Sequence, residues 1–151
     1  MTNAKPLTRP TRRTGDAAVD GLISGVIAGI VMAGYLVVSA LLSGEDVGVL
    51  LVRFDLSGGA SPLRGILMHL AVAGVFGIGY ALIWSKVNQR LRIPGWLAGS
   101  IYAAALFLLA EAILLPIANS PLLAISTQFA VGHAWFGLTL GILVDRFVDA
   151  D

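Results

Sequence analysis

Three ionisable side chains interrupt the interior of the long apolar segments in this sequence: His69, Glu111 and His133. The chain has no other histidine, and both histidines stand in the same frame. A small residue follows each of them four and eight positions later, namely Ala73 and Gly77 after the first, and Gly137 and Gly141 after the second. Because an ionisable side chain inside an apolar span is costly, these residues are the first candidates for a functional site.

Several chemistries are open to this set. A neutral imidazole ligates haem b or (bacterio)chlorophyll, and a neighbouring Gly or Ala leaves room for a flat macrocycle. His69, His133 and Glu111 together match a ligand set used by zinc and iron enzymes, although no two of them have the i, i+3 or i+4 spacing of a helical metal site. Glu111 also suits a proton or ion path, with His133, Gln128 and Thr127 as relays.

Two further interpretations involve no cofactor. Each imidazole can donate a hydrogen bond to a carbonyl of a neighbouring helix and so hold the helices together. The histidines can also belong to an interface with a partner protein. At 1.5 Å per residue, His69 lies about 10 Å and His133 about 18 Å from the outer ends of their helices, an offset that weighs against a shared bis-histidine haem.

The composition is that of a membrane protein. Of the 151 residues, 57% are hydrophobic and 13% are charged, against about 25% charged in soluble domains. The absence of cysteine excludes disulfides, iron–sulfur clusters and covalently attached c-type haem. The basic residues are too few and too close to the spans for nucleic-acid binding.

Charge-free runs near the length that crosses a bilayer define four spans. We predict an all-α membrane four-helix bundle in residues 16–151, after a basic cytoplasmic tail over residues 1–15. Ser-Pro pairs begin the second and fourth helices, and Pro116 is expected to end the third. Val47, Leu50, Leu51 and Phe54 predict a short amphipathic helix in the membrane interface, with an ordered loop as the alternative. The predicted spans are about 18–42, 62–88, 94–115 and 121–147.

Small residues recur at steps of four in every predicted span. Such residues let helix backbones approach closely, which drives helix association in lipid. Because both histidines continue these rows, we expect them to face neighbouring helices rather than lipid. The predicted packing residues are Gly21, Gly25 and Gly29, then Ala73 and Gly77, then Gly95 and Gly99, and finally Gly137 and Gly141.

The rows of small residues raise the possibility of an internal duplication into two hairpins. Gly21, Gly25 and Gly29 match Gly95, Gly99 and Ala103, and the two histidine frames match each other. Chance similarity is the alternative. Lys and Arg gather in the N-terminal tail and between the second and third spans, which predicts a cytoplasmic N-terminus and C-terminus.

The pattern resembles small, uncharacterised four-helix membrane proteins of bacteria. The similar segments are residues 25–32, His69 with Gly74 and Gly77, Leu114-Leu115-Pro116, and residues 133–137 with Gly141. The resemblance implies a four-helix fold and carries no activity with it.

These observations predict a non-catalytic protein of the bacterial cytoplasmic (inner) membrane that contacts lipid and other membrane subunits. The favoured function is an accessory or assembly subunit of a larger respiratory or photosynthetic complex. One alternative is an electron-transfer protein that binds haem b or (bacterio)chlorophyll through His69 and His133. Another is a small transporter or proton path through Glu111.

Overall fold

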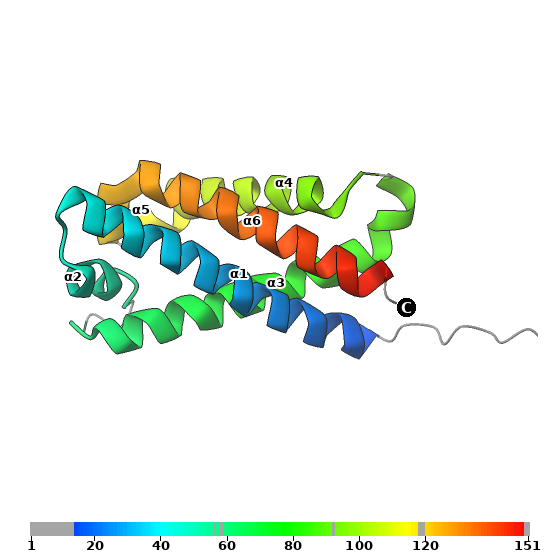
Figure 1. Ribbon diagram of the computed structural model, residues 1–151, viewed down its shortest axis with the longest axis horizontal. Helices are drawn as coiled ribbons and strands as arrows, with labels where there is room; N and C mark the ends of the chain where they lie inside the picture. Colours follow the sequence, from blue (N-terminus) through cyan, green and yellow to red (C-terminus); the bar gives the residue numbers. More distant parts are fainter. Residues whose placement is uncertain (1–13, 56, 58, 92, 118–119, 150–151) are drawn as a thin grey trace, which may run out of the picture.

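The computed structural model describes residues 14–55, 57, 59–91, 93–117 and 120–149, and this part of the chain is helical (Figure 1). Four helical segments are long and apolar enough to cross a membrane, which confirms the predicted all-α, four-span bundle. The predicted tail lies outside the described residues up to residue 13. The helices are α1 (Thr14–Ser43), α2 (Val47–Val52), α3 (Pro62–Leu91), α4 (Gly95–Leu109), α5 (Leu115–Ile117) and α6 (Ser126–Asp149).

The four long helices pair unequally. α1 packs along α3, and α4 packs along α6, so that each pair forms an antiparallel hairpin. The two hairpins meet through α1 and α6, whereas α3 and α4 hardly touch (Figure 1). The bundle therefore has a close side between α1 and α6 and an open seam between α3 and α4.

Glycines form the contact within the first hairpin. A Cβ atom on Gly21 would lie 2.6 Å from the carbonyl oxygen of Gly77, and one on Gly25 would lie 2.5 Å from that of Ala73. No side chain fits at such distances, so α1 and α3 touch backbone to backbone. This is the close packing that the rows of small residues predict.

The second hairpin repeats this contact at matching positions. A Cβ on Gly95 would lie 2.7 Å from the carbonyl oxygen of Gly141, and one on Gly99 would lie 2.2 Å from that of Gly137. Ala103, at the position that matches Gly29, also meets Gly137. The duplication inferred from a few letters thus has a counterpart in equivalent contacts.

The segment between α1 and α3 forms the predicted short helix. Gly44, with a φ of 74°, ends α1, and Asp46 caps α2 by accepting a hydrogen bond from the amide of Val49. Leu50 and Phe54 are buried, so the apolar face of α2 packs on the bundle. Gly65 makes this docking possible, since a Cβ there would lie 2.0 Å from the carbonyl oxygen of Leu51.

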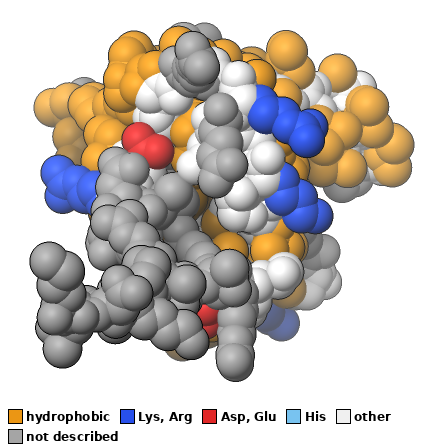
Figure 2. Space-filling view, turned by 90° about the vertical axis from the view of Figure 1, so that its right-hand side faces the viewer, with side chains coloured by type: hydrophobic (Ala, Val, Ile, Leu, Met, Phe, Trp, Pro, Cys, Tyr) orange, Lys and Arg blue, Asp and Glu red, His pale blue; other side chains and the backbone are white. Residues whose placement is uncertain are grey.

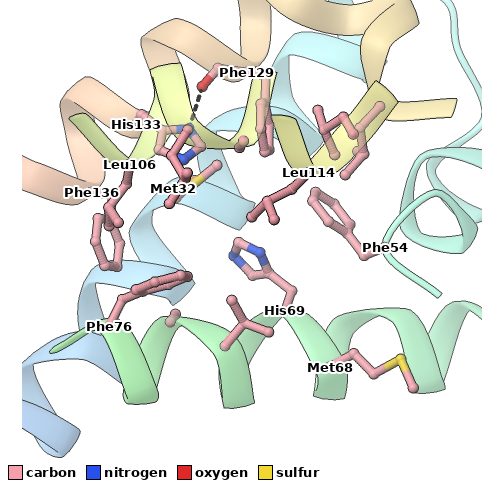
Figure 3. A pocket seen from close by; sticks show the side chains of 16 residues that line it. Met32, Phe54, Met68, His69, Phe76, Leu106, Leu114, Phe129, His133 and Phe136 are labelled. Carbon is pink, nitrogen blue, oxygen red and sulfur yellow. Dashed lines mark hydrogen bonds between the residues drawn. The ribbon is translucent and has the colours of Figure 1, made fainter. Parts of the chain in front are cut away.

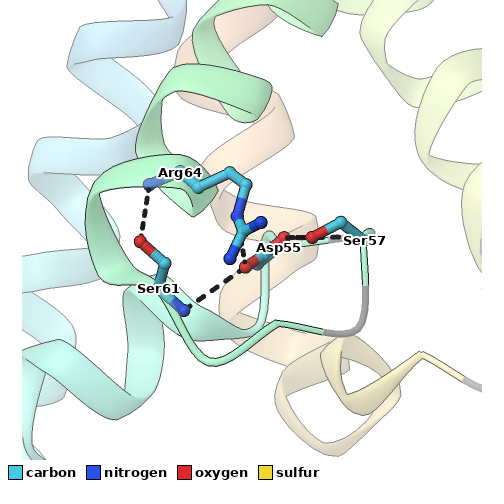
Figure 4. A network of polar contacts seen from close by, with 4 residues as sticks. All are labelled: Asp55, Ser57, Ser61 and Arg64. Carbon is cyan, nitrogen blue, oxygen red and sulfur yellow. Dashed lines mark hydrogen bonds and ion pairs between the residues drawn. The ribbon is translucent and has the colours of Figure 1, made fainter.

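A carboxylate fixes the loop that follows α2. Asp55 accepts hydrogen bonds from the hydroxyl and amide of Ser57, from the amide of Ser61 and from the Nε of Arg64 (Figure 4). Ser61 in turn caps α3 through its hydroxyl, which accepts from the amide of Arg64. The predicted Ser-Pro start is therefore part of a network that ties the loop to the first turn of α3.

Several helix boundaries differ from the prediction. α3 extends to Leu91 rather than to about residue 88, and a 3₁₀ turn (Pro121–Ile125) precedes α6 where the fourth helix was expected to begin. α1 begins at Thr14 rather than near residue 18, which also shortens the predicted tail. Helix α4 does not end at residue 115 but continues through a π-helical turn (Ala110–Leu114) into α5. Pro116 has no N–H, and a proline ring clashes with the carbonyl four residues earlier, so the chain widens ahead of it, and the described helical segment extends to Ile117, two residues past the predicted end.

Polar contacts also tie the other end of the bundle together. Asp145 on α6 accepts hydrogen bonds from the amide of Gly95 and from the indole N–H of Trp84. The hydroxyl of Tyr80 donates to the carbonyl of Gly95. Figure 2 shows Lys and Arg side chains around this end, and the exposed basic residues of the described helices there include Lys86, Arg90 and Arg146.

Candidate functional site

A cavity of about 380 Å³ lies where the two hairpins diverge. Its walls come from α1, from the turn after α2, from α3, from the end of α4 with the chain that follows it, and from α6. Of the described residues that line it, only His69 and His133 have polar side chains (Figure 3). The structure thus brings both histidines to one apolar cavity, as residues that face neighbouring helices and not lipid.

His69 links α3 to α1. Its Nε2 lies 3.0 Å from the carbonyl oxygen of Gly29. Because a carbonyl only accepts, Nε2 carries the hydrogen and Nδ1 keeps its lone pair in the neutral ring. Gly29 permits the close packing of α1 on α3 beside this bond, since a Cβ at this position would lie 2.6 Å from the Cβ of Ala73. The cross-helix hydrogen bond considered from the sequence is therefore formed by His69.

His133 is held differently. Its Nδ1 donates to the carbonyl of Phe129, one turn earlier in the same helix, at 2.9 Å (Figure 3). Its ring packs edge-on against Phe129 and Phe107, with ring centroids 4.5 and 5.6 Å away. The hydrogen on Nδ1 leaves the lone pair of Nε2 available. Its ring hydrogen bond is therefore made within α6, and its contact with a second helix is the apolar one with Phe107 on α4.

Aromatic side chains complete the walls. Phe54, Phe76, Phe129 and Phe136 all line the cavity, and the ring of Phe54 lies 4.8 Å from that of His69 (Figure 3). We did not predict these residues as part of a site. The spacing of Phe129, His133 and Phe136 at i, i+4 and i+7 places them on one face of a helix, and that pattern is visible in the sequence.

Glu111 does not join the histidines in the cavity. It lies in the π-helical turn, where the hydroxyl of Ser126 donates to its Oε1, and its Oε2 is buried without a hydrogen-bond partner. Within the described part of the chain, no three His, Cys, Asp or Glu side chains are grouped closely enough to hold a metal ion. The structure therefore does not assemble the predicted set of two histidines and Glu111.

The seam between α3 and α4 gives the cavity a partly open side. Val72 on α3 and Leu109 and Leu114 on the facing chain line the cavity and are also 45%, 41% and 48% exposed. In a membrane these surfaces contact acyl chains. Tyr102 bridges α4 to α3 across the seam, because its hydroxyl donates to the carbonyl of Phe76 at 3.0 Å.

Three features of this site follow from its residues. The cavity is apolar, it presents two imidazole nitrogens with free lone pairs, and it communicates with the lipid-facing surface. Comparison of the chain with protein-family models, with curated proteins and with solved structures gave no match.

Proposed function

We propose that this integral membrane protein is a non-catalytic binding protein for a lipophilic ligand, held in the cavity between the hairpins with His69 and His133 as its polar contacts. The observation that carries the proposal is the pair of imidazole lone pairs in an otherwise apolar cavity. An unsatisfied acceptor in an apolar setting costs free energy, which a ligand with hydrogen-bond donors or a metal centre would recover.

The position of His133 supports binding over a purely structural role. His69 already holds α3 against α1, but the ring hydrogen bond of His133 stays within its own helix. A leucine or phenylalanine there would fill the same space without burying a polar nitrogen. Polar side chains inside membrane spans are expected to have a function by default.

A macrocycle such as haem b or chlorophyll is the second candidate. The Nδ1–H of His133 is bonded to a backbone carbonyl, which is how metal-ligating imidazoles are commonly oriented. His69, however, uses its Nε2 for Gly29, so a bis-histidine site through both Nε2 atoms would require breaking that bond. A cavity of about 380 Å³ is also near the lower end of the roughly 300–1,000 Å³ found for ligand pockets.

The proposed setting is the bacterial inner membrane, with both termini in the cytoplasm. Lys86, Arg90 and Arg146 are exposed near the ends of α3 and α6, and Figure 2 shows Lys and Arg side chains gathered at this end of the bundle, as the positive-inside rule expects of a cytoplasmic face. At the opposite end Arg53 forms an ion pair with Glu45, and Arg64 forms one with Asp55. The cavity would then open into the outer half of the bilayer.

An accessory role in a larger respiratory or photosynthetic complex remains compatible with ligand binding and is tested separately. Isolation of the tagged protein in a mild detergent should yield partner subunits if the chain is an accessory subunit. Recovery of the chain alone from the membrane of its own cell would argue against that role.

The binding proposal is tested with a pair of matched variants. Ala110 lines the cavity, whereas Ala105, on the same span, is exposed on the bundle surface. Proteins with Ala110→Phe, Ala105→Phe and no change are purified from membranes, their absorption spectra are recorded, and bound lipophiles are extracted and identified by mass spectrometry. We expect a stoichiometric lipophile with the unchanged protein and Ala105→Phe, and its loss with Ala110→Phe.

One outcome of this experiment would contradict the proposal, and another would favour a macrocycle as the ligand. Equal ligand content in all three proteins would contradict binding in this cavity. A Soret or chlorophyll band that disappears with His133→Phe would favour the macrocycle over the smaller lipophile.

A further inference from the structure

The hydrogen-bond polarity of the cavity restricts its ligand. Both imidazoles give their N–H to a backbone carbonyl, that of Gly29 for His69 and that of Phe129 for His133. A positively charged ring is expensive inside a membrane span, so each ring is neutral and offers one acceptor and no donor. The complementary ligand therefore has hydrogen-bond donors.

The walls restrict its shape. Phe54, Phe76, Phe129 and Phe136 surround the histidines (Figure 3). Aromatic side chains of this kind favour a flat ring through edge and offset-stacked contacts. The cavity volume of about 380 Å³ suits one substituted ring rather than a tetrapyrrole.

The open seam accommodates the rest of the molecule. The exposed surfaces of Val72, Leu109 and Leu114 lead from the cavity to the outside of the bundle. A hydrocarbon tail on the ring can leave between α3 and α4 and lie among the acyl chains, so the tail need not fit within the cavity.

We propose that the ligand is a lipophilic aromatic diol, that is, a quinol, and that the site distinguishes it from the corresponding quinone; this inference rests on the proposed function. One hydroxyl donates to Nδ1 of His69 and the other to Nε2 of His133. A quinone would direct two carbonyl oxygens at two lone pairs. It could be accepted only if each ring changed tautomer and gave up its bond to Gly29 or Phe129.

The test compares the two oxidation states of one molecule. The full chain is placed in phosphatidylcholine nanodiscs, and the retention of a decyl-substituted benzoquinol is measured by equilibrium dialysis against that of its quinone and its dimethyl ether. Nanodiscs without protein correct for partition into lipid. One neutral hydrogen bond corresponds to about a fivefold to tenfold change in affinity. We therefore expect the quinol to bind at least about tenfold more tightly than the quinone or the dimethyl ether.

Variants assign the effect to the histidines. His133→Phe keeps a ring beside Phe129 and leaves the hydrogen bond between α1 and α3 in place, so the fold is expected to survive. It should reduce the preference for quinol by about fivefold to tenfold. Trp135→Phe, on the exposed face of the same helix, should leave the preference unchanged.

The outcomes separate this inference from the proposed function. Equal or tighter binding of the quinone, or an unchanged preference with His133→Phe, would overturn the quinol assignment while ligand binding itself stands. If neither form is retained above the level of empty nanodiscs, the quinol assignment is overturned. If, in addition, the extracted lipophile content does not respond to Ala110→Phe, the proposed function fails as well.

Discussion

Gly77 is the position at which a single methyl group should most directly separate two spans. A Cβ there would lie 2.2 Å from the carbonyl oxygen of Gly21 and 2.6 Å from the Cα of Gly25. Ordinary contacts of this kind begin near 3.4 Å. Both obstacles are backbone atoms that no rotamer change can move, so Gly77→Ala must push α1 and α3 apart by about 1 Å.

The cost follows from this displacement. Overpacking of a tight contact typically destabilises a protein by about 1–3 kcal/mol. The intrinsic helix preference works the other way, because alanine is favoured over glycine by about 1 kcal/mol in a helix. We therefore expect Gly77→Ala to lower the free energy of unfolding by up to about 2 kcal/mol, and to be about 1–3 kcal/mol less stable than a glycine-to-alanine variant that makes no such contact.

The control is Gly34→Ala, on the neighbouring helix. Gly34 is exposed, and a Cβ there would have nothing within 4 Å. This variant should keep the stability or raise it by up to about 1 kcal/mol. Gly141→Ala, whose Cβ would lie 2.2 Å from the carbonyl of Gly95, should behave as Gly77→Ala does if the two hairpins are equivalent.

The measurement is reversible unfolding in mixed micelles with increasing sodium dodecyl sulfate, followed by far-ultraviolet circular dichroism. The reasoning would be refuted if Gly77→Ala and Gly34→Ala gave the same unfolding midpoint. If Gly77→Ala lowered the unfolding midpoint but Gly141→Ala behaved as Gly34→Ala does, the equivalence of the two hairpins would be refuted and the packing argument for Gly77 would stand.

Four further predictions concern the polar contacts. Asp145→Ala should cost about 1–3 kcal/mol in the same unfolding assay and shift the tryptophan emission, with Asp145→Asn milder, because a buried indole N–H and an α4 amide lose their acceptor. Asp55 has a pKa below its ordinary value of 3.8, chiefly through a serine hydroxyl hydrogen bond, so its stabilising contribution is present above that value and is lost as the pH falls through the lower folded pKa. An acid titration of unfolding should show this loss in the unchanged chain and not in Asp55→Asn. Glu111→Gln keeps an acceptor for its serine partner and should change stability by less than about 1 kcal/mol, while proton flux into liposomes that disappears with this variant would support the transport alternative. Tyr102→Phe removes the hydroxyl bridge between α4 and α3 and should increase hydrogen exchange of the amides along the seam, whereas an unchanged exchange pattern would argue against that role.

The helices and their contact faces were predictable because they depend on periodicity within each segment. Two glycines four residues apart in a span predict a close helix contact, as Gly21 and Gly25 do in α1 and Gly137 and Gly141 do in α6. The end of α4 was not predictable in the same way. Pro116 was expected to end the third span, and the described helical segment does extend only to Ile117, but the π-helical turn ahead of the proline had no signal in the sequence.

The cavity could not be predicted from the periodicity of the sequence. A row of small residues shows that a helix has a close neighbour, but it does not show which of the remaining helices the neighbour is. Both histidines were expected to face other helices, and they do, but their meeting at one cavity depends on α1 pairing with α6 while α3 and α4 stay apart. Glu111 shows the same limit, because its distance along the chain from Ser126 gave no sign that they would be bonded.

The open seam itself has a residue-level cause if the hairpins are copies. On the close side, Gly132 of α6 lets Met32 of α1 approach, so that a Cβ there would lie 3.2 Å from the Met32 side chain. The matching position on α3 is Met68, and the position on α4 that matches the fully buried Ala28 is Tyr102.

At these two positions a large side chain on α3 or α4 matches a small one on α6 or α1. Met68 lines the cavity, and Tyr102 spans the gap with its hydroxyl on the carbonyl of Phe76. Two nearly equivalent hairpins therefore cannot close both sides of the bundle to the same depth. The space left on the wider side is the cavity that both histidines line, so if the hairpins are copies, their divergence at these positions would account for the proposed binding site.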